Sequence, residues 1–281
     1  MAVIHLSDEF LAPYRTTQPP LNELGSFVYY RTYSRWLPTE GRREHWHETV
    51  QRVVEFNINL DPDPSIAEAE KIFDNIFHLR QFPAGRSLWI GGTEAGQAYA
   101  LANFNCAFRV IDSLGAFGEL FYLLMCGTGA GFRVLPEDVS HIPPLRPIEV
   151  EHMPYLSFPA SMRLEHTESS LVDGVLTIEV GDSKEGWVEA LDLFLRSALT
   201  DAPVYKVNFI YDNVRPKGER LKRFGGTASG HESLRNMFEK IGSVINNLPD
   251  GQMRPVDALD IANIIGENVV VGGKFSLCLQ H

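Results

Sequence analysis

Cysteine is scarce in this chain, and its scarcity excludes a disulfide scaffold. The 281 residues hold three cysteines, Cys106, Cys126 and Cys278, which are too few and too scattered for the framework of a secreted protein. No Cys-x-x-Cys motif occurs, which argues against a zinc ribbon. The nine histidines show no metal-ligand pattern, because His45 and His47 stand two apart and so do not share a helix face. We therefore expect no metal site.

Long apolar runs and an excess of positive charge are also absent. No stretch approaches the roughly 18 uninterrupted apolar residues of a membrane-spanning helix, and residues 1–10 lack the basic start and apolar core of a signal peptide. Lys and Arg number 25 against 36 Asp and Glu, for a net charge of −11. That balance disfavours nucleic acids and anionic membranes as partners, although the basic cluster between Lys217 and Arg223 can still bind a small phosphate. We expect a cytoplasmic protein.

The chain is long enough to bury a large core, and its first part predicts helices. Residues 1–26 are rich in proline and predict an extended lead-in. The aromatic and basic segment 27–35 (FVYYRTYSR) predicts an edge strand or an arm packed on the body. Apolar positions at helical spacing predict one helix over 43–59 and a second that opens with a capping box at Ser65 and Glu68.

Strands alternate with helices from residue 82 onward, which indicates an α/β fold, open or barrel-like. The six prolines between residues 136 and 170 predict a long irregular excursion, of the kind that often forms a lid, a binding loop or an interface. Gly115 and Gly118 each cost a helix about 1 kcal/mol relative to alanine, so they suggest close packing against another backbone. Strands are predicted within 101–111 and at 175–180 and 204–211, and helices at 113–126, at 183–199, after 230 and at 255–270.

The segment 224–230 (FGGTASG) is a candidate for anion binding. It follows a strand and precedes a helix whose start is predicted as a capping box of Ser229 and Glu232. A loop in that position presents backbone N–H groups to an anion, but it can equally be a tight turn that lets sheet and helix pack closely. It is not a Walker A motif, since no Gly-Lys-Ser/Thr is present. The phosphate-loop candidate comprises Gly225, Gly226, Thr227, Ala228, Ser229 and Gly230.

A second glycine-rich loop is predicted at residues 127–131, after a helix that separates it from Cys106. Its glycines lack the Gly-x-Gly-x-x-Gly spacing and do not follow a strand, so a dinucleotide-binding fingerprint is excluded. A helix C-cap accounts for the first glycine, whereas the other two need another reason, such as a substrate lying against the backbone. The thiol of Cys106 marks either a redox or nucleophilic site or a packed core turn. Cys126 is expected to be structural, because a helix C-terminus disfavours a thiolate.

Four stretches together resemble the catalytic chain of the ribonucleotide reductase family, and the adenosylcobalamin-dependent (class II) ribonucleoside-triphosphate reductases match best. The most specific is Phe-Gly-Gly-Thr-Ala-Ser-Gly after Arg-Pro-Lys-Gly, which is a far stronger signal than a lone glycine motif. The resemblance covers residues 27–272. It implies an α/β fold in which 82–272 form the N-terminal half of a ten-stranded barrel of the ribonucleotide reductase / glycyl-radical type, after a small helical region at 27–81. The four stretches are 27–35, 82–93 (FPAGRSLWIGGT), 103–132 and 215–232.

Cys106 is the residue to which the resemblance gives a chemical role. In the family a thiyl radical abstracts the ribose 3′-hydrogen, the 2′-hydroxyl leaves as water, and two further cysteines become a disulfide; Cys106 matches the first of these two. The resemblance also implies a ribonucleoside triphosphate substrate, a deoxynucleotide effector, thioredoxin or a similar dithiol reductant, and adenosylcobalamin as cofactor. It places Asn105, Gly127, Gly129 and Gly131 against the substrate, and Asp112, Ser113 and Leu114 at the start of the effector site.

Residues 273–281 depart from the family pattern, which fits as far as Gly272. The half that would follow in the family carries the radical cysteine, the second reducing cysteine and most of the cobalamin-binding region. We therefore expect an N-terminal fragment of a reductase that serves DNA synthesis, inactive alone, with a separately encoded C-terminal half as one candidate partner. Two alternatives stay open: the large chain of a diiron (class I) ribonucleoside-diphosphate reductase, and a non-catalytic nucleotide-binding remnant.

Overall fold

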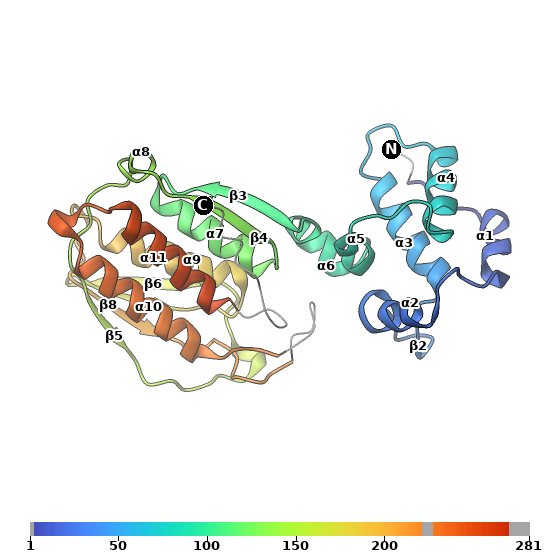
Figure 1. Ribbon diagram of the computed structural model, residues 1–281. Helices are drawn as coiled ribbons and strands as arrows, with labels where there is room; N and C mark the ends of the chain where they lie inside the picture. Colours follow the sequence, from blue (N-terminus) through green and yellow to red (C-terminus); the bar gives the residue numbers. More distant parts are fainter. Residues whose placement is uncertain (1–2, 221–226, 270–281) are drawn as a thin grey trace. The chain divides into compact units, whose positions relative to one another are not determined.

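The computed structural model describes residues 3–220 and 227–269, and the chain divides into two compact units (Figure 1). Unit 1 comprises residues 1–104 and unit 2 comprises residues 105–281. The division falls further along the chain than residue 82, where the sequence predicts the α/β part to begin. None of the helices in the described parts of the chain combines the length and the apolar character that crossing a membrane requires.

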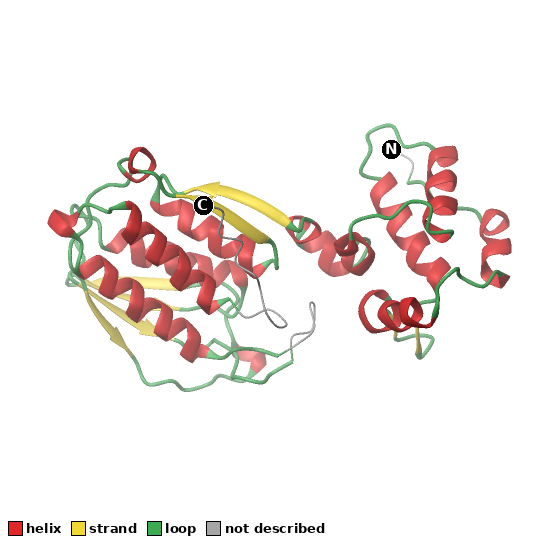
Figure 2. Cartoon of the chain, viewed as in Figure 1, coloured by secondary structure: helices red, strands yellow, loops and turns green. Residues whose placement is uncertain are grey.

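Unit 1 is mainly helical, with one short hairpin (Figure 2). Its core lies between α3 and α4, which confirm the two helices predicted from apolar spacing; Val50 and Phe73 are fully buried there. Ser65 caps α4 by accepting a hydrogen bond from the N–H of Glu68 at 3.4 Å. The elements are α1 (Asp8–Thr16), α2 (Glu23–Val28), η1 (Tyr29–Tyr33), β1 (Trp36–Leu37), β2 (Arg42–Arg43), α3 (Trp46–Ile58), α4 (Ile66–Phe77), α5 (Gly85–Ile90), α6 (Glu94–Ala98) and η2 (Ala100–Asn103).

The extended lead-in predicted for residues 1–26 is wrong, because α1 and the start of α2 lie within it. Ser7 caps α1 by accepting a backbone hydrogen bond in the first turn. The ring of Tyr14 packs edge-on against Phe73 of α4, with the ring centroids 4.8 Å apart. Tertiary packing of this kind stabilises a helix even though Pro13 lies inside it and supplies no backbone N–H.

Of the two structures predicted for residues 27–35, the packed arm is confirmed and the edge strand is wrong. The segment ends α2 and then forms η1, a single π-helical stretch. Tyr29 is 3% exposed, and its hydroxyl donates to the carbonyl oxygen of Glu44 at 3.0 Å. Its ring meets that of Trp46 edge-on, with centroids 5.3 Å apart. These contacts hold the arm against α3.

Two strand–helix–strand units form the framework of unit 2, which has the predicted α/β layout. In the first of these, β3 and β4 form a two-stranded parallel sheet and α7 connects them. In the second, α9 connects β7 to β8, which run parallel in a four-stranded sheet of order β5-β8-β7-β6. β6 runs antiparallel to β7. Helices α7, α9, α10 and α11 lie between the two sheets (Figure 1) and share one core with them. The elements are β3 (Cys106–Val110), α7 (Leu114–Met125), β4 (Gly129–Arg133), α8 (Pro136–Val139), β5 (Glu149–His152), η3 (Ala160–Met162), β6 (Glu168–Val172), β7 (Val175–Glu179), α9 (Lys184–Ser197), β8 (Lys206–Ile210), α10 (His231–Asn246), η4 (Pro249–Gly251) and α11 (Pro255–Asn268).

The stretch 136–170 is only partly irregular, and the predicted excursion is wrong where it contains α8, β5 and the start of β6. β5 pairs in parallel with β8 at the edge of the sheet. Glu149 and Glu151 of β5 both pair with Nζ of Lys206, at 2.9 and 2.7 Å, while Val150 between them packs against the core. Prolines surround this short, charged strand, so its alternation is hidden in the sequence.

The two glycines of α7 differ in their surroundings. A Cβ on Gly118 would lie 3.2 Å from Cγ1 of Val188 in α9, so the packing there is close, but it is against a side chain and not against another backbone as predicted. A Cβ on Gly115 would meet nothing within 4 Å, so the same suggestion is wrong at that position.

A matched pair of glycine substitutions in unit 2 tests how closely the backbone packs at Gly181 and at Gly115. A Cβ on Gly181 would collide with the backbone of Glu165 and His166, so we expect Gly181→Ala to destabilise the protein by about 1–3 kcal/mol. Gly115→Ala, with open space around it, should leave the free energy of unfolding unchanged or raise it by up to about 1 kcal/mol. Urea denaturation of both variants checks this. Equal effects at the two positions would contradict the packing described here.

Candidate functional site

The β3–β4 ladder brings the exposed thiol and two glycines together. Cys106 lies opposite Gly129, and Phe108 lies opposite Gly131. The N–H of Gly129 donates to the carbonyl oxygen of Asn105 at 2.9 Å. Cys106 is exposed, so its thiol stands on an open face of the sheet beside a residue that has no side chain. The structure thus brings Cys106 together with three of the four predicted substrate-binding residues, Asn105, Gly129 and Gly131.

Gly129 and Gly131 belong to β4 and not to a loop, so the predicted glycine-rich loop is wrong beyond residue 128. Neither glycine has a positive φ. A Cβ on Gly129 would lie 3.4 Å from the carbonyl oxygen of Asn105, and one on Gly131 would lie 3.5 Å from Phe108, which are ordinary contacts. Glycine weakens a strand unless a ligand or another backbone comes close. Neither the backbone conformation nor a contact with the described residues requires glycine at these two positions.

Gly127 has a local explanation. It follows α7 with φ 78°, and its N–H donates to the carbonyl oxygen of Leu124 at 2.8 Å. The N–H of Thr128 donates to the carbonyl oxygen of Leu123 at 3.1 Å, which completes a Schellman motif. The predicted helix cap is confirmed, and a substrate contact at Gly127 stays a prediction.

Cys126 is not accessible for redox chemistry. It is 1% exposed and stands at the C-cap of α7. The negative end of the helix dipole lies there, which disfavours a thiolate. Its burial agrees with the predicted structural role.

Asp112 and Ser113 lead from the far end of β3 into α7. Ser113 is the N-cap of α7, but its hydroxyl donates to Oδ1 of Asp112 at 3.3 Å and makes no cap hydrogen bond. Nη2 of Arg109 donates to the same oxygen at 3.3 Å, and Nε of Arg109 pairs with Glu119 at 2.6 Å. Leu114 is 7% exposed and belongs to the core. The start of α7 therefore offers a partly exposed carboxylate and N–H groups that no side chain caps.

The thiol and the Asp112 end of β3 are separate places on the molecule. Asp112 follows Cys106 by six positions, and an extended chain of that length spans about 20 Å. One strand therefore carries two candidate sites, one at each end.

The phosphate-loop candidate lies partly outside the described residues, which do not include Gly225 and Gly226. Ala228 exchanges backbone hydrogen bonds with Gly218 and Glu219, at 3.0 and 2.8 Å. Thr227 and Arg220 form an isolated antiparallel bridge next to them. The described residues on both sides therefore form the base of a hairpin.

α10 begins at His231, with Gly230 as its N-cap at φ 84°. The predicted capping box of Ser229 and Glu232 is wrong, because no side chain makes a cap hydrogen bond here. Ser229 instead accepts a hydrogen bond from the hydroxyl of Ser233 at 3.2 Å. A glycine N-cap with positive φ provides the sharp turn into the helix. The predicted helix after the candidate loop is confirmed, whereas residues 224–226 of that loop lie outside the described residues.

An ion-pair network that the sequence does not reveal fixes the base of this hairpin. Arg163 pairs with Glu219 at 2.9 Å and with Asp182 at 3.6 Å, and Asp182 also pairs with Nε of Arg215 at 2.9 Å. The side chains of Arg163 and Asp182 are only 8% and 10% exposed. These pairs offset the cost of burying the two charges. Their partners lie up to 56 positions apart, so local spacing carries no signal for them.

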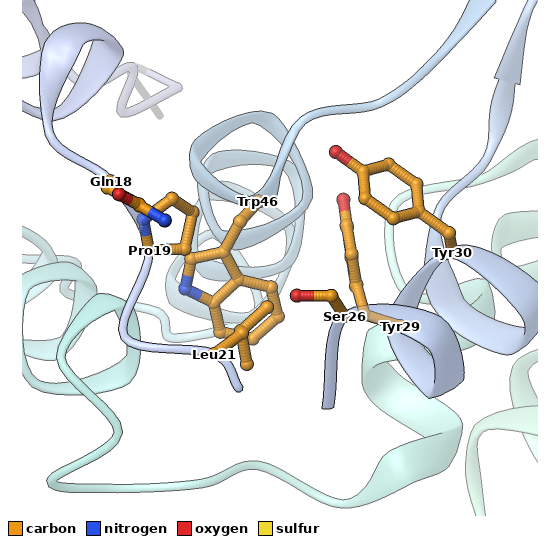
Figure 3. A pocket seen from close by; sticks show the side chains of 7 residues that line it. All are labelled: Gln18, Pro19, Leu21, Ser26, Tyr29, Tyr30 and Trp46. Carbon is orange, nitrogen blue, oxygen red and sulfur yellow. The ribbon is translucent and has the colours of Figure 1, made fainter. Parts of the chain in front are cut away.

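A cavity of about 100 Å³ in unit 1 is too small for a nucleotide (Figure 3). The hydroxyl of Tyr29 is bonded to the carbonyl oxygen of Glu44, and Nε1 of Trp46 donates to the carbonyl oxygen of Phe77 at 3.0 Å. The polar atoms of the two most buried rings are therefore already satisfied. The lining residues are Gln18, Pro19, Leu21, Ser26, Tyr29, Tyr30 and Trp46.

Two family descriptions match this chain. Residues 6–93 match the ribonucleotide reductase alpha domain, and residues 159–245 match the insertion domain of B12-dependent ribonucleotide reductase. The second match spans η3 to the penultimate residue of α10 and thus most of the four-stranded sheet. It also includes the hairpin base and its ion-pair network.

Curated relatives and a solved structure agree with these matches. The chain is 37% identical to the adenosylcobalamin-dependent ribonucleoside-triphosphate reductase of Lactobacillus delbrueckii subsp. bulgaricus, over 96% of this chain and 42% of the relative. It is 34% identical to the enzyme of that name from Lactobacillus helveticus, over 91% and 40%. A crystal structure of a B12-dependent (class II) ribonucleotide reductase superimposes with a TM-score of 0.82 and 33% identity, over 95% of this chain and 43% of that chain.

This chain spans about two-fifths of the length of the relatives that it matches. Within that length, the similarity in sequence and in fold extends over more than nine-tenths of this chain. The chain is therefore similar, over nearly its whole length, to part of the B12-dependent ribonucleotide reductases.

Proposed function

We propose that this chain is part of an adenosylcobalamin-dependent ribonucleoside-triphosphate reductase and carries one of its two reducing thiols. The observation that supports this most is the exposed thiol of Cys106 on the open face of β3, opposite Gly129. A ribose can approach that thiol closely because neither Gly129 nor Gly131 projects a side chain. The relatives that carry this activity are similar to the chain over nearly its whole length.

The proposed reaction replaces the 2′-hydroxyl of the ribose by hydrogen. The C2′–O bond breaks and the oxygen leaves as water, while two thiols give up two electrons and two protons and become a disulfide. Cys106 is one of these thiols. Cys126 is buried and does not qualify as the second, so we propose that the second thiol comes from outside the described residues. A thioredoxin-like dithiol would then reduce the disulfide.

We also propose that β3 and β4 are two strands of a ten-stranded barrel. Parallel strands normally lie in larger sheets covered on both faces. Within the described residues, β3 and β4 pair only with each other, and Phe108 is 63% exposed on the same face as Cys106. Further strands paired along these edges would close the sheet into a barrel, and that face would then line its interior. The four-stranded sheet, most of which matches the insertion domain, would lie outside the barrel.

The far end of β3 is the proposed effector site. A deoxynucleotide would donate its ribose hydroxyl to the carboxylate of Asp112, which is 42% exposed. The N–H groups at the start of α7 favour a phosphate there, since Ser113 does not cap them. The hairpin base before α10 is a second candidate for phosphate binding, with Gly230 as the glycine that turns the chain into the helix.

Adenosylcobalamin initiates the radical reaction in the proposed enzyme. The cavity of about 100 Å³ in unit 1 does not fit a corrin ring. We therefore assign none of the described residues to the cofactor, and no step is derived through it.

Protection of the thiol tests the proposed substrate site. In a Cys278→Ser variant, a ribonucleoside triphosphate should slow the alkylation of Cys106 by iodoacetamide several-fold. Gly131→Ala should raise the nucleotide concentration that gives half-maximal protection of Cys106 by about tenfold or more, because the added Cβ enters the open face of the sheet. The melting temperature should not change, since that Cβ makes only ordinary contacts within the fold. Gly115→Ala is the matched control, since its Cβ meets nothing. A thiol that reacts equally fast with and without nucleotide would refute the proposed site.

A further inference from the structure

Two histidines and two tyrosines form an aromatic cluster where β5 and the residues after it meet α10. His152 ends β5, and His231 begins α10. The rings of Tyr155 and His231 stack with their centroids 3.8 Å apart, and those of His152 and Tyr211 stack at 5.8 Å. The ring of Tyr211 also lies 6.0 Å from that of His231. The cluster therefore holds two titratable imidazoles that the proposed function does not use.

The surroundings of His152 favour its neutral form. Its side chain is 6% exposed, and its ring stacks on that of Phe209, with the centroids 5.5 Å apart. Its Nδ1 lies 2.8 Å from the hydroxyl oxygen of Tyr211, a residue that is 1% exposed. A buried hydroxyl needs an acceptor, and the part of the chain that the structure describes offers this one no other than Nδ1. A proton on Nδ1 would therefore leave the Tyr211 hydroxyl without its acceptor.

A positive charge on His152 would find little compensation. Nε2 has no hydrogen-bond partner among the described residues, and Oε1 of Glu239 is 3.8 Å away. That oxygen already accepts a hydrogen bond from Arg235 at 3.0 Å, and the positive charge of Arg235 also faces the imidazole. The two glutamates of β5 lie on the other face of the sheet, where they pair with Lys206. Burial therefore lowers the pKa of His152, and Glu239 offsets only part of that effect.

His231 is also placed to be neutral. As the first residue of α10 it lies at the positive end of the helix dipole, which disfavours a cation. Its partial burial is the largest cause that lowers its pKa, and Arg235 lowers the pKa further. The carboxylates of Glu232 and Asp212 act in the opposite direction without reversing the shift. Both imidazoles of the cluster thus resist protonation while the fold is intact.

The cluster lies at the end of an edge strand. β5 pairs with β8 alone among the strands that the structure describes. Beyond it, the N–H of Met153 donates to the carbonyl oxygen of Phe209 at 2.9 Å, and the hydroxyl of Tyr155 donates to that of Val214 at 2.8 Å. An edge strand with few hydrogen bonds opens at a lower free energy than the strands inside a sheet. The end of β5 is therefore a place where a small change in charge can open the structure locally.

We propose that this cluster is an acid-sensitive switch, which holds β5 and residues 153–155 against α10 while both imidazoles are neutral and releases them when the imidazoles take up protons. In the folded state the pKa values of His152 and His231 lie below the ordinary value of 6.5, so the opened segment takes up protons first. The contribution of the cluster to stability is complete above about pH 6.5 and is lost as the pH falls through the folded-state values. The switch needs no nucleotide, so it does not depend on the proposed function.

Hydrogen exchange of the full chain, followed by mass spectrometry from about pH 7.5 to about pH 5.5, tests the switch. After correction for the intrinsic rate, exchange at residues 149–155 should rise several-fold as the pH falls. His152→Gln and His231→Gln should each remove part of this rise, and the double variant should remove all of it, because glutamine does not titrate. Tyr211→Phe should also weaken the pH dependence, since no hydroxyl then needs Nδ1 of His152.

His166→Gln is the matched control. His166 is exposed, and its hydrogen bond with Glu189 at 2.8 Å raises its pKa, so it titrates outside the cluster. Its replacement should leave the exchange of residues 149–155 and the pH dependence of that exchange unchanged. Circular dichroism of each variant at neutral pH confirms that the fold is kept.

Exchange at residues 149–155 that does not depend on pH after the correction would overturn the proposal. A rise that persists in the double variant would also overturn it, because other groups would then be responsible. The imidazole proton resonances of the wild type give a reading that needs no variant. Those of His152 and His231 should titrate below pH 6.5, and titration at or above that value would contradict the switch.

Discussion

Replacing Cys106 by serine is expected to abolish the reduction of ribonucleoside triphosphates by the assembled enzyme, with a loss on the order of a thousandfold or more. A hydroxyl cannot take part in a disulfide, so one of the two proposed electron-donating thiols would be lost. Because Cys106 is exposed, the substitution should leave the melting temperature unchanged. The measurement is the steady-state formation of deoxynucleotide in the presence of adenosylcobalamin and a dithiol. A second polypeptide, corresponding to the part of the relatives that this chain does not cover, is added to the assay.

Cys126→Ala is the control for that experiment. Cys126 is buried at the end of α7, so its removal should affect stability and leave the turnover of the folded enzyme in place. Turnover that survives Cys106→Ser would show that the thiol is not a reductant. If nucleotide binds and protects Cys106 but the assembled wild type never turns over, the chain would be a nucleotide-binding remnant.

The amphipathic helices of both units are predictable from the sequence because each buries one continuous apolar stripe. α4 and α10 show this most clearly, with buried residues at helical spacing over their whole lengths. Strands β7 and β8 are predictable for the matching reason, since every second side chain is buried. In these elements, local pattern and tertiary environment agree.

The elements that prediction misses depend on contacts with distant residues. In the segment 27–35, consecutive aromatic residues favour a strand, yet Tyr29 turns inward to bond the carbonyl oxygen of Glu44, fifteen positions away. α1 contains Pro13, which argues against a helix, and the helix persists because Tyr14 packs on Phe73. No local rule contains these partners.

The candidate site was predictable as a set of residues but not as a geometry. The resemblance selects Cys106, Gly129 and Gly131, and spacing alone shows a thiol, a helix and a glycine-rich segment. The helix α7 then returns the chain so that β4 runs parallel to β3, which places Gly129 opposite Cys106. The two glycines of β4 favour a loop in a prediction from sequence, because glycine is depleted in strands and no described contact requires it here.

Arg52→Leu is expected to have the largest effect on stability, a loss of about 3–5 kcal/mol. Glu44 is 4% exposed, and Arg52 binds both of its carboxylate oxygens. Without Arg52, a buried carboxylate is left without its charged partner. Urea denaturation measures the loss. Arg15→Leu, which removes an exposed pair with Asp8, is the control and should cost less than about 1 kcal/mol.

The Glu44–Arg52 pair also predicts how stability depends on acid. Burial alone raises the pKa of Glu44, but the hydrogen bonds and charge of Arg52, with the hydroxyl of Thr49, outweigh it and hold the pKa below its ordinary value of 4.5. The unfolded chain therefore takes up the proton first, so the ionised carboxylate stabilises the fold above about pH 4.5, and this contribution is lost as the pH falls through the folded-state pKa. Glu44→Gln should accordingly be less stable than the wild type near neutral pH, and the gap should narrow in acid. A gap that stays constant over the acid range would mean that the side chain acts through its shape and hydrogen bonds and not through its charge.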